Sequence, residues 1–198
     1  MKESKGKRRT KLRIQPDWRW ITSVFGATIG ISAAMSLVSN GLLSGSGIAV
    51  SFLILMVIIL LGIVFDIIGV AVTAAEERPF HSMAAKKVPE AKEALNMLRR
   101  ADRVSSFCND VVGDICGVIS GSASAVIATQ AVVGLQPLWA SAVQLLMSAV
   151  VAGLTVGGKA FGKSLAMQNA TAILHTAARL IYAVKSVPRR LAALIGRG

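Results

Sequence analysis

Two long stretches without a charged side chain constrain this chain more than any other feature. One runs from Trp20 to Phe65 and the other from Ile115 to Gly158. All 22 Lys and Arg residues lie outside these stretches, in three blocks at 2–19, 78–103 and 159–197. A helix needs about 20 apolar residues to cross a bilayer, and a soluble core helix needs fewer. The pattern therefore predicts a membrane protein with several spans.

Turn-forming residues divide each apolar stretch in two. The first is interrupted at 39–47, which is rich in Ser, Asn and Gly, and the second at Gly134-Leu135-Gln136-Pro137. The four predicted spans are 18–38, 48–75, 104–133 and 138–156. We expect an all-α fold: a polytopic membrane helical bundle of about four transmembrane helices with amphipathic juxtamembrane helices.

Charge predicts the surroundings and the orientation. The chain is 54% hydrophobic and carries a formal net charge of +12. Because the basic blocks alternate with apolar runs, and no aromatic platform accompanies them, we expect anionic lipid headgroups as partner and no nucleic acid. Four crossings place the three basic blocks on one side, and Lys and Arg favour the cytoplasm. We expect an inner or plasma membrane protein with both termini cytoplasmic, beginning with a basic cytoplasmic segment at 1–17.

Two further segments have the pattern of amphipathic helices. In 82–101, apolar residues recur at steps of four and three between Lys and Arg residues, which predicts one cytoplasmic helix. The basic segment 166–198 repeats this pattern, and we expect a juxtamembrane tail along the inner membrane surface.

Glycine spacing predicts where helices approach closely. Gly26 and Gly30 are four residues apart, as are Gly113, Gly117 and Gly121. This spacing lets helix backbones meet in lipid. It indicates close helix packing, within the chain or in a homodimer.

Charged residues inside the spans are the candidates for function, because a charge in the membrane is costly. Asp66 lies in the second span, and Asp110 and Asp114 lie four apart in the third, beside Asn109. Lys159 follows the fourth. Two interpretations are open: oxygen ligands for a divalent cation such as Mg²⁺, or acids that neutralise lysines in a structural network. No nucleophile and base pair, phosphate loop or cofactor motif is present, so we expect no enzyme.

Four segments occur in an order and spacing typical of one transporter family. They are Phe65–Val72, the stretch from Met83-Ala84 to Asp102–Ser106, Cys108–Gly113, and Gly158–Ala166. As a set they resemble motifs of the transmembrane domain of the CNNM/CorC/CorB magnesium transporters, over about 62–188. The resemblance implies a module of this kind at 47–165, with 18–39 as an additional transmembrane helix. It also implies transport or efflux of Mg²⁺ or Co²⁺, and a homodimer.

The resemblance also implies a set of ligands. In that family, oxygens from a Ser, two Asn, a Glu and a glycine carbonyl hold the cation. Here Asp66 replaces the Ser, Gly113 the second Asn and Lys159 the Glu, whereas Asn109 is kept. The predicted metal ligands are Asp66, Asn109, Asp110, Asp114 and Gly158, with Lys159 as counter-charge.

Three functional hypotheses follow. The first is divalent cation transport by alternating access. The second is a transport-inactive membrane interaction or regulatory protein in which Lys159 replaces the bound cation, because an ammonium repels a divalent ion. The third is a lipid-binding scaffold that uses the basic segment 2–13. The family usually continues into cytosolic CBS domains, and here the chain stops at Gly198, so we expect any such regulation to come from a separate cytosolic partner.

Overall fold

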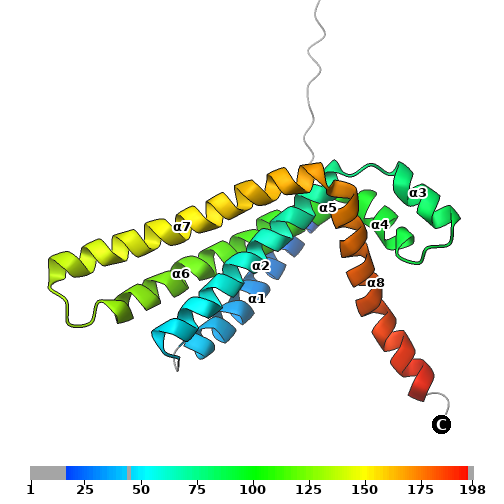
Figure 1. Ribbon diagram of the computed structural model, residues 1–198. Coiled ribbons are helices and arrows are strands. Elements are labelled where there is room, and N and C mark those ends of the chain that lie inside the picture. The colour runs from blue at the N-terminus through cyan, green and yellow to red at the C-terminus, as the bar shows by residue number, and fades with distance from the viewer. Residues whose placement is uncertain (1–16, 44–45, 196–198) are drawn as a thin grey trace, which may run out of the picture.

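The computed structural model describes residues 17–43 and 46–195, and these residues are helical with no strand (Figure 1). The elements are α1 (Trp18–Leu43), α2 (Ile48–Ala74), α3 (Arg78–Ala85), α4 (Ala91–Leu98), α5 (Ala101–Ser106), the π-helix η1 (Phe107–Gly113), α6 (Asp114–Ala131), α7 (Pro137–Gln168) and α8 (Ala170–Ile195). The all-α prediction is confirmed. The predicted basic segment 1–17 lies outside the described residues, apart from Asp17.

Within the described residues, four helical segments are long and apolar enough to cross a membrane, as predicted. They are Trp18–Ser39, Ile48–Ala74, Ala101–Ala131 and Pro137–Gln168. The third runs without a break through α5, η1 and α6. Large apolar side chains on the outside of the bundle, such as Leu138 and Leu145 of α7, are strongly exposed, as expected for contact with lipid.

The helix α2 is the centre of the bundle and contacts α1, α6, α7 and α8. Figure 1 shows α1, α2 and α6 side by side, with the α6–α7 turn extending away from the other helices. That turn follows the sequence prediction, since Gly134 has a φ of +88° and Pro137 begins α7.

The start of α1, the end of α2, α5 and the end of α7 lie together, and we call this the basic end. Asp17, just before α1, accepts a 3.5 Å hydrogen bond from Arg103 of α5, whose guanidinium also lies 5.0 Å from the ring centroid of Trp20. Ala74 of α2 and Gln168 of α7 line one pocket at this end. The α6–α7 turn lies at the opposite end.

The prediction of a single helix over 82–101 is wrong. The segment forms the end of α3 and all of α4, separated by a turn in which Lys87 has a φ of +57°. Pro89 explains the break, because proline has no N–H to donate and disfavours helical backbone at the residue before it. A second break at Arg100 separates α4 from α5.

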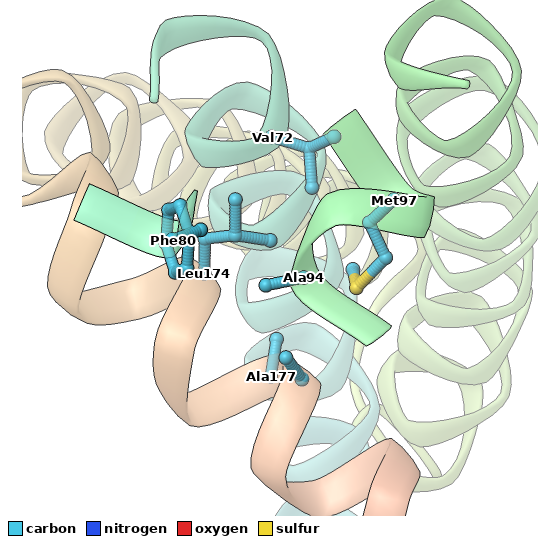
Figure 2. Packing of buried hydrophobic residues seen from close by; sticks show 7 residues of the cluster. Val72, Phe80, Ala94, Met97, Leu174 and Ala177 are labelled. Carbon is cyan, nitrogen blue, oxygen red and sulfur yellow. The ribbon is translucent and has the colours of Figure 1, made fainter. Parts of the chain in front are cut away.

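These short helices build a small apolar core with the end of α2 and the first turns of α8, which we call the juxtamembrane core (Figure 2). It consists of Val72, Phe80, Ala94, Met97, Leu174, Ala177 and Ala178. Two pairs link α8 to the stretch around α4: Lys185 with Glu93 at 2.7 Å, and His175 with Glu90 at 3.7 Å. The tail is amphipathic as predicted, and its buried face packs against protein.

The fourth span is longer than predicted. The sequence places its end near Val156 and the start of the tail at 166, but α7 continues to Gln168 and α8 begins at Ala170. Ala, Leu, Lys, Met and Gln are strong helix formers, so the charges at Lys159 and Lys163 do not end the helix. Both lysines therefore lie within α7.

Close helix contacts occur mostly at glycines that the spacing did not indicate. A Cβ on Gly62 would lie 2.9 Å from the Cβ of Cys116, and one on Gly162 would lie 2.8 Å from Ile67. The predicted packing glycines have open space instead, apart from Gly113; they are Gly26, Gly30, Gly117 and Gly121. Spacing alone does not say which face of a helix meets a neighbour.

Candidate functional site

The candidate site lies where α2, η1 and α7 meet. Asp66 of α2 is 4% exposed and lies eight positions before Ala74 at the basic end. At a rise of 1.5 Å per residue, its carboxylate lies about 12 Å from the end of the helix. A carboxylate at this depth requires compensation from its protein neighbours.

The segment opposite Asp66 is η1, a π-helix in the first half of the third span. π-Helices are rare, form i→i+5 hydrogen bonds and occur often at functional sites. This one contains Asn109, Asp110 and Gly113, and Asp114 follows as the first residue of α6. The sequence gives no signal for it, because a π-helix has no compositional pattern.

Asn109 is held against α2 at a glycine. A Cβ on Gly69 would collide with Oδ1 of Asn109, so only glycine leaves room for this amide. Its Nδ2 donates a 3.3 Å hydrogen bond to Oγ of Ser105. Sequence reasoning did not single out Gly69 or Ser105, which position Asn109, although both lie in segments that carry the family resemblance.

Lys159 of α7 points to the same place. Its Nζ donates a 3.3 Å hydrogen bond to the carbonyl of Gly113 and lies 3.8 Å from Oδ1 of Asp114. A Cβ on Gly113 would lie 3.3 Å from this Nζ and 3.6 Å from Oδ1 of Asp66. We call Asp66, Gly113, Asp114 and Lys159 the lysine–aspartate cluster.

Two oxygen atoms beside this cluster are buried and have no hydrogen-bond partner among the described residues. They are Oδ2 of Asp66 and Oδ1 of Asn109. A buried acceptor without a donor costs about 1–3 kcal/mol, and more if it is charged. Gly69, which contacts Asn109, lies three residues after Asp66 on α2. The two unpartnered oxygens therefore lie about one helical turn apart along the contact between α2 and η1. Acceptors of this type are ligands for hard cations or water.

Three of the residues that the sequence singled out lie around Gly113: Asp66, Asp114 and Lys159, although the side chain of Asp114 is 73% exposed. Asn109 belongs to the same π-helix but meets Gly69 of α2 instead. Asp110 is exposed on the outside of η1. Gly158 packs against Ile63 of α2.

The predicted group of three carboxylates therefore does not converge. Within residues 17–43 and 46–195, no three His, Cys, Asp or Glu side chains are arranged to hold a metal ion. The physical reason is that Asp110 and Asp114 are both exposed, while Lys159 occupies the space beside Gly113. The assignment of these residues as cation ligands stays a prediction.

Comparisons of this chain with models of known protein families, with curated proteins and with solved structures gave no match.

Proposed function

We propose that this chain transports a small divalent cation, Mg²⁺ in the first instance, through the lysine–aspartate cluster. The observation that carries the proposal is the pair of unpartnered buried oxygens on Asp66 and Asn109. Both are hard oxygen donors, as Mg²⁺ prefers. The choice of Mg²⁺ as the ion comes from the resemblance of the same segments to the CNNM/CorC/CorB family.

In this proposal, Lys159 acts as a tethered cation. In the ion-free state its ammonium holds the Gly113 carbonyl and Asp114. A lysine and a divalent ion repel each other, so the ammonium leaves when the ion binds. Its flexible four-carbon stem permits this movement. Asp66, Asn109 and Asp114 then become ligands, joined by Asp110 and the Gly158 carbonyl as the helices shift during alternating access.

The proposal places the basic end on the cytoplasmic side of an inner or plasma membrane, in contact with anionic headgroups. It also includes a homodimer. Asp110 and Asp114 are exposed on the outside of the third span, and a second copy would shield them from lipid. A separate cytosolic protein would dock at the basic end to regulate transport.

Flux through proteoliposomes tests the proposal. Purified protein is reconstituted with a Mg²⁺-sensitive dye inside, and Mg²⁺ is added outside. We expect uptake that Asp66→Asn reduces at least tenfold, because the buried carboxylate is lost. Asp102→Asn, exposed on α5, is the matched control and should leave uptake unchanged. Equal uptake by Asp66→Asn and the native chain would refute the assignment.

One observation favours a second function, that of a transport-inactive membrane interaction or regulatory protein. The Lys159 ammonium already has two partners in the cluster. If this arrangement is permanent, Lys159→Ala destabilises the protein and no variant of the cluster changes flux. The same liposomes distinguish the two functions, since this alternative requires the native chain to give no uptake above empty vesicles.

A further inference from the structure

A cleft between α6 and α7 lies next to the lysine–aspartate cluster. Its volume is about 190 Å³. Glycines and hydroxyl side chains line it together with apolar ones: Gly117, Ser120, Gly121 and Ser124 of α6, and Ser148, Val151, Ala152, Thr155 and Val156 of α7. The four α6 residues follow the i, i+3, i+4, i+7 spacing and therefore form one face. We call this space the serine cleft.

One buried hydroxyl in the serine cleft, that of Ser124, has no partner in the part of the chain that the structure describes. Ser120 donates to the Gly117 carbonyl at 2.9 Å, and Thr155 donates to the Val151 carbonyl at 2.8 Å, so both are satisfied within their own helices. Ser124 is 1% exposed, and its Oγ has no hydrogen-bond partner among the described residues. Burying a hydroxyl without a hydrogen-bond partner costs free energy, so a polar molecule in the cleft would stabilise this atom.

Water fits the cleft in size and chemistry. A volume of 190 Å³ corresponds to about six water molecules at ~30 Å³ each. A water needs two to four polar partners, and the hydroxyls of Ser120, Ser124, Ser148 and Thr155 provide them. A lipid acyl chain would leave the Ser124 hydroxyl unpaired.

The serine cleft leads toward the charged cluster. Gly117 lies three residues after Asp114, and Thr155 lies four residues before Lys159, about one helical turn in each case. From there the cleft extends away from the basic end, toward the α6–α7 turn at 132–136.

We infer that the serine cleft is a hydrated passage that connects the lysine–aspartate cluster with the membrane side on which the α6–α7 turn lies. Its ligands are water and, by extension, a small cation. The identity of the cation rests on the proposed function, whereas the presence of water does not.

Cysteine accessibility tests the inference. Ser124→Cys and Gly121→Cys are made separately in a chain that carries Cys108→Ala and Cys116→Ala. Gly121 has open space where the new Cβ would lie. Ser122→Cys is the matched control, at the same depth but on the exposed outer face of α6. Leu135→Cys, in the turn, marks the side from which a reagent acts.

The variants are treated in sealed vesicles with a charged, membrane-impermeant thiol reagent on the side that labels Leu135→Cys. Such a reagent requires thiolate, which forms in water and not in lipid. We expect Ser124→Cys and Gly121→Cys to react at least tenfold faster than Ser122→Cys. Rates equal to or below that of Ser122→Cys, or reaction only from the opposite side, would overturn the inference. Fast labelling together with no Mg²⁺ flux would refute the proposed function and keep the passage.

Discussion

Replacing Lys159 by Met tests whether its ammonium compensates the buried charge of Asp66. The Lys159 Nζ and the Asp66 Oδ1 both lie within 3.6 Å of the same point, the Cβ position on Gly113, so they are no more than about 7 Å apart. At an effective dielectric constant of about 20, two unit charges at about 7 Å attract each other by about 2 kcal/mol. We expect Lys159→Met to lower the free energy of unfolding by at least about 2 kcal/mol.

A double-mutant cycle isolates this attraction from other effects of the substitution. The native chain, Lys159→Met, Asp66→Asn and the double variant are unfolded by SDS titration from mixed micelles. The coupling free energy should be about 2 kcal/mol, because Asp66→Asn removes the charge that Lys159 compensates. Lys163→Met, one turn along α7, is the control and should change stability by less than about 0.5 kcal/mol. A coupling below about 0.5 kcal/mol would contradict the electrostatic account of the cluster.

Three other substitutions test the packing. Gly69→Ala should destabilise the chain by about 1–3 kcal/mol in the same titration, because the added Cβ collides with Asn109. Gly26→Ala, which adds a Cβ in open space, should change stability by less than about 0.5 kcal/mol. Equal effects of the two substitutions would contradict the contact between Gly69 and Asn109. Phe80→Ala should lower the free energy of unfolding by about 3–5 kcal/mol, since Phe80 is fully buried in the juxtamembrane core. It should also speed limited proteolysis between α2 and α4, and an unchanged cleavage rate would argue against this core. Lys185→Ala should cost less than about 1 kcal/mol, because its ion pair is exposed, and a larger loss would mean that the pair anchors α8.

The sequence predicts the spans well because their signal is local. A bilayer requires about 20 apolar residues for each crossing, and the charge-free stretches supply them. The turn before α7 is equally readable, since Gly134 and Pro137 mark it by their backbone preferences.

The site is less predictable, because tertiary contacts decide it. Asp110 and Asp114 lie four residues apart and both are exposed, because the π-helix and the packing of α2 determine which side chains of this segment are buried. Gly69 has no glycine three or four residues away that would single it out, and its role is visible only in the structure, where Asn109 lies against it. The resemblance placed Lys159 at an ion site, and the contact of its ammonium with the Gly113 carbonyl required the structure.

The central claim is that the Lys159 ammonium occupies a cation site, and calorimetric Mg²⁺ titration of purified protein tests it most directly. Lys159→Glu removes the tethered cation and adds a carboxylate. If this replacement favours the bound ion by at least about 1.4 kcal/mol, affinity rises tenfold or more over the native chain. Asp66→Asn in the same background should abolish the gain, and Asp102→Asn should preserve it. Mg²⁺ binding by Lys159→Glu that is no tighter than that of the native chain would contradict the claim.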